Sequence, residues 1–237
     1  MRFKTIKIIS NPLKPWAKQI ARQVSEHLRK AGYTVAPAGT DLTICVGGDG
    51  TILYANHQGK IEGAVLGIGS ERSFICQLTK DNWKKKILSL LRMGKTENRQ
   101  MLSASSSGKT YTAINDFVIH AKDYRVIELD VRMRGKDHWF EADGIIMSTA
   151  TGSYAYAFSA GGKKLPLQSK NIVVVPICPY KQRFKPSILP NTGTVMIKVN
   201  RESAFIVDGI FIRNIRQGEK VTVRAGTTIR FIKRMKP

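Results

Sequence analysis

The residues most able to do chemistry form a glycine-rich turn, Gly47-Gly48-Asp49-Gly50-Thr51. The turn follows an apolar run at residues 42–46, and residues 52–57 can continue it as a helix. Glycine lets backbone N–H groups approach an anion and a helix N-terminus favours negative charge, so this pattern predicts a phosphate site. A carboxylate repels phosphate, and Asp49 therefore indicates either Mg²⁺ ligation or general-base work on a hydroxyl group. The plainer alternative is that Asp49 only caps the following helix.

A second polar segment, Asp143 through Tyr156, joins a predicted strand at residues 144–148 to a predicted helix that begins near Ser153. Hydroxyl and amide groups at a helix start suit the oxygens of ribose and phosphate, although an ordinary Ser/Thr cap with core tyrosines fits equally. The pair Asn115-Asp116 interrupts an apolar strand and needs polar partners. Asn115 can read the edge of an adenine or a nicotinamide amide, or it can belong to a structural network.

The segment Ser107-Gly108-Lys109-Thr110 ends like a Walker A phosphate loop. The first glycine of that motif is missing, because Ser103 stands in its place. The segment also joins two predicted strands, whereas a phosphate loop joins a strand to a helix. We interpret it as a hairpin turn.

The elements that must position these residues differ between the two parts of the chain. Up to residue 93, predicted strands at 4–9, 33–36, 42–46 and 64–68 alternate with predicted helices at 16–30, 52–57 and 81–93, which is typical of a parallel sheet. After Gly94 we expect strands at 99–105, 110–120, 125–134, 138–140, 144–148 and 227–233, one helix from Ser153 to Gly161-Gly162, and a type I′ hairpin at Asp208-Gly209. The predicted fold class is α/β plus β-rich, with an N-terminal Rossmann-like parallel α/β domain at residues 1–93 and a β-sandwich-like C-terminal domain at residues 94–237.

The composition of the chain is strongly basic. The 237 residues include 39 Lys and Arg against 17 Asp and Glu, which gives a net charge of +22. Such a field attracts polyanions. The basic residues are nevertheless spread along the chain, and no RNA-recognition, KH or zinc-finger pattern is present, so specific nucleic-acid binding is not expected.

Three cysteines, Cys45, Cys76 and Cys178, form no C-x-x-C pair. This spacing argues against a disulfide framework or a zinc site and favours reduced thiols in the cytoplasm. No segment approaches the roughly 20 uninterrupted apolar residues of a membrane span, and the N-terminus lacks the apolar region and cleavage site of a signal peptide. We expect a soluble cytoplasmic protein that has no membrane partner.

Taken together, these segments resemble the NAD kinase family, in the family's order and over most of the chain. The glycine turn alone is shared with diacylglycerol and sphingosine kinases, whereas the segments at 151–153 and 176–179 favour the NAD kinases. The landmarks are the turn at 47–51, Asn115-Asp116, Asp143-Gly144 with residues 148–153, Tyr156 with Gly161-Gly162, Pro176-Ile177-Cys178-Pro179 and Asp208-Gly209.

The resemblance implies transfer of the γ-phosphoryl group of ATP, or of a polyphosphate unit, to the 2′-hydroxyl of the adenosine ribose of NAD, which gives NADP. It implies that Asp49 is the base on that hydroxyl, while Mg²⁺ or another divalent metal neutralises the donor. It also implies that Asp143 reaches the nicotinamide end, often across a subunit contact, so that the protein forms a homodimer or homotetramer. The implied binding residues are Gly47, Gly48, Gly50 and Thr51 in the phosphate turn, and Phe74, Asn115, Asp116, Thr151, Ser153, Ala155 and Tyr156 around NAD.

Several positions depart from the family pattern. Asp116 replaces the usual Glu, and the missing methylene would move a ribose contact by about 1.5 Å. The run at residues 68–76 lacks the family's Asn and Gly-Phe-Leu, which affects the assignment of Phe74. Tyr154 replaces a small Thr, and Lys163-Lys164 would reshape the pocket mouth or hold donor phosphates. The chain ends in the predicted strand at 227–233, without the longer tail by which many members return to the first domain.

Two other classes of function remain open at this point. A lipid kinase of the diacylglycerol type shares the glycine turn and would accept a lipid hydroxyl. A non-catalytic nucleotide-binding or nucleic-acid-binding protein would account for the charge of +22.

Overall fold

The computed structural model describes residues 3–123 and 125–234, and the chain divides into two compact units. Unit 1 holds the residues up to Asn98 together with those from Ile229 onward, and unit 2 holds Arg99–Thr228. Among the helices of the described residues, none is long and apolar enough to cross a membrane.

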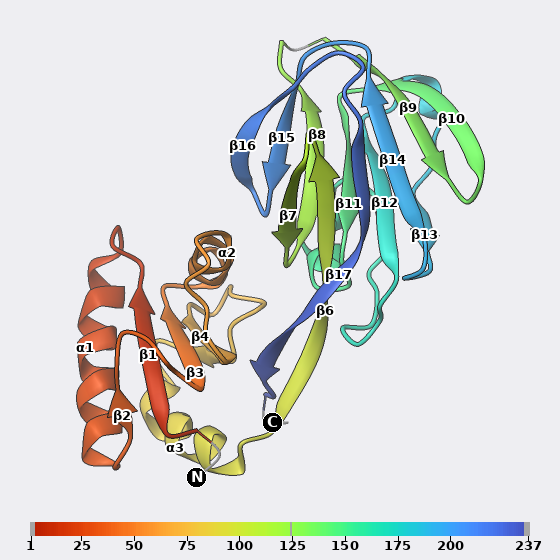
Figure 1. Ribbon diagram of the computed structural model, residues 1–237. Helices are drawn as coiled ribbons and strands as arrows, with labels where there is room; N and C mark the ends of the chain where they lie inside the picture. Colours follow the sequence, from red (N-terminus) through yellow and green to blue (C-terminus); the bar gives the residue numbers. More distant parts are fainter. Residues whose placement is uncertain (1–2, 124, 235–237) are drawn as a thin grey trace. The chain divides into compact units, whose positions relative to one another are not determined.

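Unit 1 is built on a parallel sheet with the strand order β2-β1-β3-β4 (Figure 1). Short β5 pairs with the end of β4, and the last part of the long strand β17 pairs with β4 through Phe231 and Val65. All of these pairings are parallel. The strands are β1 (Thr5–Ser10), β2 (Thr34–Val35), β3 (Leu42–Val46), β4 (Ala64–Gly69), β5 (Leu78–Thr79) and β17 (Val221–Ile232).

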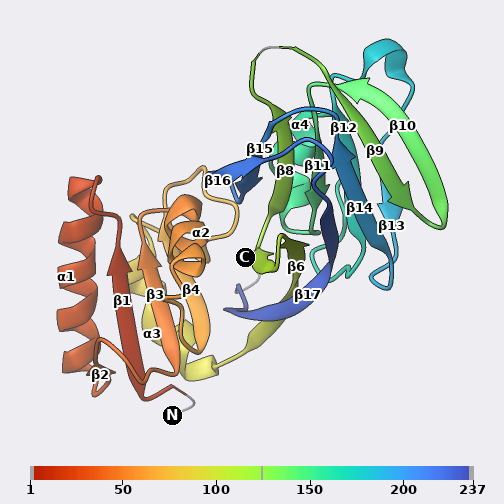
Figure 2. The same ribbon diagram turned by 45° about the horizontal axis from the view of Figure 1, so that its top comes forward.

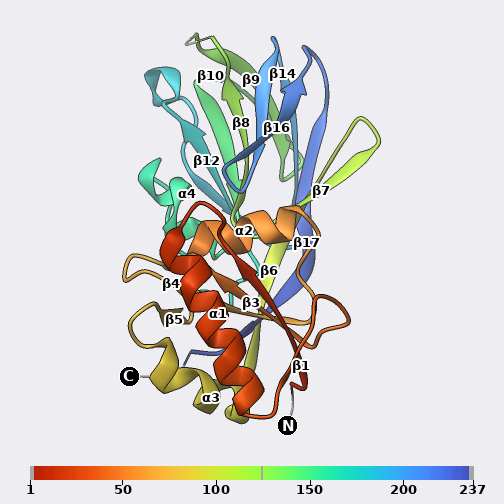
Figure 3. The same ribbon diagram turned by 90° about the vertical axis from the view of Figure 1, so that its left-hand side faces the viewer.

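Helices cover both faces of this sheet, which confirms the Rossmann-like prediction. Helix α1 (Pro15–Lys30) and helix α3 (Trp83–Met93) share one hydrophobic core with β1, β3 and β4, and Figure 3 shows α1 in front of the strands. The buried stripe of α1 is Ala17, Ile20, Val24 and Leu28, as its period predicts. Helix α2 (Asp49–His57) packs on the other face, where Ile52 lies against Gly67 and leaves no room for a Cβ there.

The C-terminal end of the chain corrects one expectation. The strand predicted at 227–233 is the last part of β17, and it returns to unit 1 instead of ending in the second domain. The reason is that β17 is long enough, at 12 residues, to pair in unit 2 first and with β4 afterwards. The observed division, at Asn98 and again before Ile229, therefore differs from the single boundary at 93/94.

Unit 2 contains two antiparallel sheets whose inner faces share one hydrophobic core, which confirms the β-sandwich-like prediction. One sheet has the order β13-β12-β11-β8-β15-β16, and the other runs β10-β9-β14-β17, with β6 paired to β17 and β7 (Figure 2). The strands are β6 (Thr96–Ser106), β7 (Lys109–Ala113), β8 (Asp116–Ala121), β9 (Ile127–Met133), β10 (Lys136–Ala142), β11 (Gly144–Ser148), β12 (Ile172–Ile177), β13 (Ser187–Leu189), β14 (Thr194–Val199), β15 (Ser203–Val207) and β16 (Ile210–Ile215).

The two predicted hairpin turns are present. Asp208 and Gly209 have φ values of 51° and 78°, which is the left-handed pair that a type I′ turn requires, and they join β15 to β16. Ser107 and Gly108, with φ values of 48° and 74°, join β6 to β7. The segment that imitates a Walker A motif is therefore a hairpin, as predicted.

Two predicted elements of unit 2 were wrong in extent. The strand expected at 110–120 is two strands, because the chain leaves the sheet of β6 and β7 after Ala113 and enters the other sheet at Asp116. The helix expected from Ser153 to Gly161 is a 3-10 turn, η1 (Gly152–Tyr154), followed by the short helix α4 (Tyr156–Ser159). The dihedral angles of Ala155, φ −105° and ψ −126°, interrupt the helix.

Candidate functional site

The glycine turn of unit 1 adopts a conformation that depends on its first two glycines. Gly47 and Gly48 have φ values of 143° and 100°, and a Cβ on Gly47 would lie 2.4 Å from the Thr51 hydroxyl oxygen. Their N–H groups both donate to the Ile68 carbonyl at the end of β4, at 2.9 and 3.2 Å. The ammonium group of Lys14 donates to the Gly47 carbonyl at 2.7 Å. The turn is thus fixed between β3 and α2, with a cation beside it.

The Asp49 side chain does not cap helix α2, so the plainer alternative from the sequence is wrong. Its carboxylate accepts hydrogen bonds from the N–H groups of Phe74, Ile75 and Cys76, at 2.7, 2.9 and 3.1 Å. The Cys76 thiol also interacts with this carboxylate. Asp49 therefore holds residues 74–76 beside the glycine turn.

Phe74 lies half-buried next to this carboxylate. Its carbonyl accepts from the guanidinium of Arg234, as does the carbonyl of Cys76. Burial raises the pKa of the Cys76 thiol, and the nearby Asp49 charge adds to the effect. Burial also raises the pKa of Cys45 to about 12, so neither thiol is a nucleophile at neutral pH.

In unit 2 the polar pair Asn115-Asp116 lies where the chain changes sheets, and its partner is Asp208. The buried Asp208 carboxylate accepts from the N–H groups of Ile114, Asn115 and Asp116, at 2.9, 2.7 and 3.1 Å. The sequence identified Asp208 as a turn residue and a landmark but gave it no role at the site. The signal that could have found it was the need of the 115–116 pair for partners.

The hydroxyl-rich turn after β11 wraps around the same backbone. The hydroxyl of Ser148 donates to the Asn115 carbonyl at 3.1 Å, and the hydroxyl of Thr149 donates to the Ile114 carbonyl at 2.7 Å. A Cβ on Gly152 would lie 2.3 Å from the Asn115 carbonyl oxygen, so the close approach of the turn requires glycine. These contacts bring residues 115, 116 and 148–153 together, as the sequence predicted.

One predicted binding residue has its side chain committed internally. The Ser153 hydroxyl is fully buried, donates to the Ala150 carbonyl at 2.7 Å and accepts from the Leu165 N–H at 3.0 Å. These two hydrogen bonds of the Ser153 hydroxyl stabilise the turn. Thr151 is buried in the same turn, and Ala155 is exposed beside it.

The side-chain oxygen of Asn115 is buried and has no hydrogen-bond partner among the described residues. An amide oxygen in that position loses its hydration without compensation, at a cost of about 1–3 kcal/mol. The Thr51 hydroxyl oxygen of unit 1 is likewise buried and has no hydrogen-bond partner among the described residues. Both oxygens can accept a hydrogen bond from a bound polar molecule. The Thr51 hydroxyl can also donate one.

Three ionisable side chains lie close together in unit 2. Burial, and secondly the charge of Asp208, raise the pKa of Asp116 to about 7. Partial burial raises the pKa of the Tyr156 phenol, with smaller contributions from the charges of Cys178, Asp116 and Asp143. The charges of Asp116 and Asp143 thus both act on Tyr156, which was predicted at the same site. A carboxyl group that titrates near pH 7 is typical of a functional site.

Two of the residues that depart from the family pattern, Tyr154 and Lys164, lie close to each other in the structure. The Lys164 ammonium lies 4.0 Å from the centre of the Phe158 ring and 5.5 Å from that of Tyr154. This is a cation–π arrangement, so Lys164 is held by the two rings.

Comparison with known proteins decides the family. A model of the ATP-NAD kinase C-terminal domain matches residues 114–233, which is half of the chain. The chain belongs to the NAD kinase family. The matched region begins at the sheet change beside Asn115, includes the whole cluster around Asp208, and continues to the end of β17.

Curated NAD kinases match most of the chain. The NAD kinase of Treponema denticola is 29% identical over 93% of this chain and 87% of its own length. That of Caldicellulosiruptor bescii is 33% identical over 76% of this chain and 72% of its own.

Two solved structures have the same fold. An NAD kinase from Archaeoglobus fulgidus, in complex with ATP, has 21% identity and a TM-score of 0.83, and the match covers 98% of this chain and 94% of that one. A yeast NADH kinase complexed with NADH has 21% identity and a TM-score of 0.88, covering 99% and 84%.

Membership of the NAD kinase family decides between the classes that the sequence left open. The chain is an enzyme, a phosphotransferase that phosphorylates NAD. The lipid-kinase and non-catalytic alternatives are set aside.

Proposed function

We propose that the two units have separate tasks in NAD phosphorylation: unit 2 binds NAD and the glycine turn of unit 1 serves the phosphoryl donor. The product is NADP, formed by transfer to the 2′-hydroxyl of the adenosine ribose. The observation that carries the NAD assignment is the buried, unpartnered side-chain oxygen of Asn115. An adenine amino group or a ribose hydroxyl would supply the missing donor.

The other NAD contacts in this proposal surround Asn115. Asp116 would contact the ribose or adenine, and Asp143 the nicotinamide end. Thr151, Ala155 and Tyr156 would line the dinucleotide, and Ser153 would act through the turn that it fixes, since its hydroxyl is committed to Ala150 and Leu165. Phe74 of unit 1 would pack on a base.

Asp49 is the proposed general base on the 2′-hydroxyl. The three N–H groups from which it accepts hydrogen bonds hold the carboxylate in one orientation, as a general base requires. Gly47, Gly48, Gly50 and Thr51 would receive the donor phosphates. Gly50 is exposed and a Cβ there would meet nothing within 4 Å, which is consistent with a position kept open.

ATP is the donor that we favour, because the related archaeal NAD kinase was solved in complex with ATP. The proposal also includes Mg²⁺, which in other phosphotransferases neutralises donor phosphates. In the described part of the chain no group of three or more His, Cys, Asp or Glu side chains could hold a metal ion. These residues do not build a resident metal site, so we assign no ligand and derive no step through a protein-bound metal.

A homodimer or homotetramer and a cytoplasmic location complete the proposal. Asp143 is half-buried and Tyr156 is exposed on unit 2, so a second subunit could reach these residues at the proposed nicotinamide end of NAD.

The variant Asp49→Asn tests the proposed base, since it keeps the shape and one oxygen of the side chain. We expect turnover, measured as NADP formed, to fall by roughly 10²–10⁴-fold because a general base contributes about that much. The amide also loses at least one of the N–H contacts that hold residues 74–76, so the loss of turnover should exceed any rise in the KM for NAD, as expected for a group that acts in the transition state. Asp81→Asn, an exposed acid of unit 1, is the control and should keep full activity.

A different result would identify a supporting role. If Asp49 serves only to hold residues 74–76, Asp49→Asn will retain turnover while KM rises and the amides of Phe74, Ile75 and Cys76 exchange faster with solvent.

A further inference from the structure

Residues 74–76 of unit 1 contact two side chains of opposite charge. Their three N–H groups donate to the Asp49 carboxylate. The Arg234 guanidinium, near the end of the chain, donates to the carbonyl oxygens of Phe74 and Cys76 through its Nη2 atom. Asp49, this segment and Arg234 all belong to unit 1. The two contacts of Arg234 span 160 and 158 positions of sequence, so no motif could indicate them.

One peptide group contacts both charged side chains. The carbonyl of Phe74 and the N–H of Ile75 belong to the same peptide group, and the described residues contain no cis peptide bond. In a trans peptide the C=O and the N–H point in opposite directions, so Asp49 and Arg234 lie on opposite sides of the segment. A cation at the C=O and an anion at the N–H polarise the peptide group in the same sense, and each hydrogen bond strengthens the other. Loss of the guanidinium should therefore weaken the hydrogen bond from Ile75 to Asp49.

The end of β17 brings Arg234 to this position. Phe231 and Ile232 are fully buried, and the Lys233 N–H donates to the Lys95 carbonyl at 2.9 Å. The backbone is thus fixed over the three residues that precede Arg234. The guanidinium itself is exposed, and a guanidinium is less strongly hydrated than an ammonium group, which favours contacts with carbonyls at a surface.

The segment that Arg234 contacts has little other support. Residues 70–77 lie between β4 and β5 and form neither a helix nor a strand. Backbone groups outside regular structure need other hydrogen-bond partners. Asp49 supplies a partner for three N–H groups and Arg234 a partner for two carbonyls. The same run lacks the Asn and the Gly-Phe-Leu of the family pattern, so this support is a feature of the present chain.

We propose that Arg234 is a positioning residue for the reaction, which acts through residues 74–76 to hold the Asp49 carboxylate in the orientation that a base requires. This inference rests on the proposed function, in which Asp49 is the base on the 2′-hydroxyl. Arg234 acts on the peptide group between Phe74 and Ile75 and not on the substrate. A catalytic group misplaced by about 1 Å can lose on the order of 10²-fold in rate, so the support of Asp49 affects turnover.

The first test measures the support of residues 74–76 in the full chain without substrate. Arg234→Ala removes the guanidinium, and Lys233→Gln, which removes an exposed charge at the neighbouring position, is the control. We expect hydrogen exchange of the Ile75 amide to become roughly tenfold faster in Arg234→Ala and to stay at the wild-type rate in the control. Thermal unfolding of both variants verifies that they are folded. Wild-type exchange at Ile75 in Arg234→Ala would overturn the proposal.

The second test measures turnover, as NADP formed from NAD and ATP. We expect kcat to fall by roughly 10–100-fold in Arg234→Ala and by less in Arg234→Lys, which keeps a charged donor. Guanidinium ion, added far below the concentrations that unfold proteins, should restore part of the turnover of Arg234→Ala, because the exposed site is open to solvent. Lys233→Gln should keep full turnover. Equal turnover in Arg234→Ala and this control would contradict the assigned role.

A double variant shows whether Arg234 acts through Asp49. Added to Asp49→Asn, the change Arg234→Ala should lower kcat by less than about threefold further, because the group that it positions is already absent. Losses that multiply in the double variant would show that Arg234 acts independently of Asp49 and would overturn the proposal.

Failure of the proposed function would give a different pattern. If Asp49→Asn keeps wild-type turnover while Arg234→Ala still speeds exchange at Ile75, Asp49 is not the base, and the support of residues 74–76 by Arg234 stands.

Discussion

At the scale of single residues, two carboxylates have the same task in different units. Asp49 accepts the N–H groups of three consecutive residues, 74–76, and Asp208 accepts those of residues 114–116. Each carboxylate fixes the backbone of a residue proposed to bind substrate, Phe74 or Asn115. The contacts join residues at least 25 and 92 positions apart in sequence, so spacing within a motif could not reveal them.

Asp116 gives a prediction about pH. Burial and the charge of Asp208 raise its pKa to about 7 from the ordinary value of 3.8. Stability that depends on the protonated form is fully present below pH 3.8 and is lost as pH rises through 7. We expect Asp116→Asn to be more stable than wild type at pH 8, by at most a few kcal/mol at about 1.4 kcal/mol per pKa unit.

Urea unfolding of wild type and Asp116→Asn across this pH range is the measurement, and the difference should vanish toward pH 4. Asp137→Asn removes an exposed carboxylate of the same unit and is the control, for which no such trend is expected. An Asp116→Asn protein with the pH profile of wild type would contradict the prediction.

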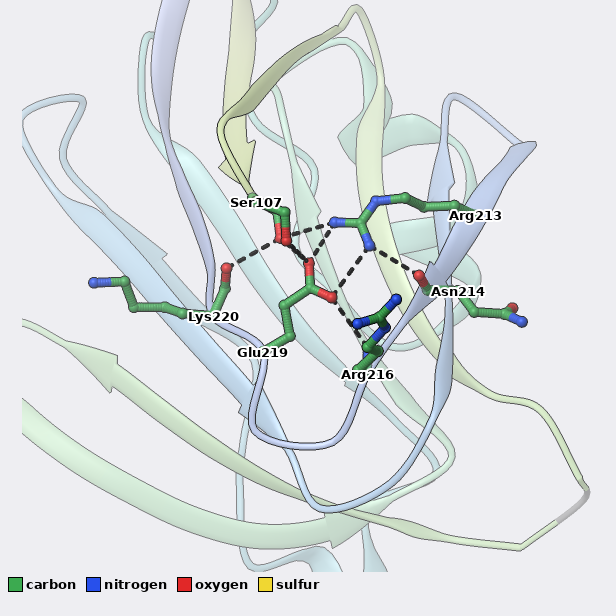
Figure 4. Close-up of polar contacts among 7 residues, drawn as sticks. Ser107, Arg213, Asn214, Arg216, Glu219 and Lys220 are labelled. Carbon is green, nitrogen blue, oxygen red and sulfur yellow. Dashed lines mark hydrogen bonds and ion pairs between the residues drawn. The ribbon is translucent and has the colours of Figure 1, made fainter.

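At the scale of elements, one glutamate ties two turns of unit 2 together (Figure 4). Glu219, just before β17, accepts from the hydroxyls of Ser106 and Ser107 at 2.6 and 2.7 Å. It also pairs with the Arg213 guanidinium of β16 at 2.5 Å and accepts the Arg216 N–H at 3.1 Å. The β6–β7 hairpin and the β16–β17 connection are thus held by one carboxylate.

Glu219→Gln should therefore destabilise the protein. We expect a loss of about 1–3 kcal/mol at pH 7, because Arg213 and two hydroxyls lose a charged acceptor. The hydrogen bond from Arg213, above all, lowers the pKa of Glu219, so its contribution is present above the ordinary value of 4.5 and is lost as pH falls below it. The gap between wild type and variant, measured by urea unfolding, should shrink on acidification.

Glu202→Gln provides the matched control, since its pair with Lys122 is about half exposed. An exposed pair contributes about 0–1 kcal/mol, so this variant should stay close to wild type. If both variants behave alike, the Glu219 network does not hold the turns.

The sequence predicted the elements whose pattern is local. Helix α1 has a clear apolar period, β3 has a buried run bounded by Asp41 and Gly47, and the Asp208-Gly209 turn has its own chemistry. It did not predict that the segment at 110–120 divides between two sheets, because the distant Asp208 carboxylate accepts the N–H groups there. Nor did it predict the break at Ala155, which lies in backbone dihedral angles and not in residue type.

At the scale of the whole molecule, the last strand belongs to both units. β17 pairs with β14 in unit 2 and ends against β4 in unit 1, which is why a boundary drawn once along the sequence could not describe the division. The net charge of +22 is a sum over the whole chain, so it did not indicate where a site lies. Folding places Lys18, Arg22 and Arg29, three of these basic residues, along one groove of unit 1.

Phe231 tests the importance of this final strand. Its side chain is fully buried and it pairs with Val65. We expect Phe231→Ala to lower the free energy of unfolding by about 3–5 kcal/mol, the usual cost for a buried phenylalanine. Phe211→Ala, at a side chain that is 58% exposed, is the control and should cost less than about 1 kcal/mol. A loss in Phe231→Ala as small as the one expected for the control would show that the end of β17 is not important for stability.

The turn at Asp208-Gly209 has a consequence for protein engineering. Asp-Gly and Asn-Gly are interchangeable by the rules of type I′ hairpins, so a consensus or turn-propensity score would treat Asp208→Asn as neutral. The amide, however, has one acceptor oxygen for three N–H donors, and the segment that it supports contains Asn115. A library screened only for a folded hairpin would accept a substitution that a library screened for NADP production should reject.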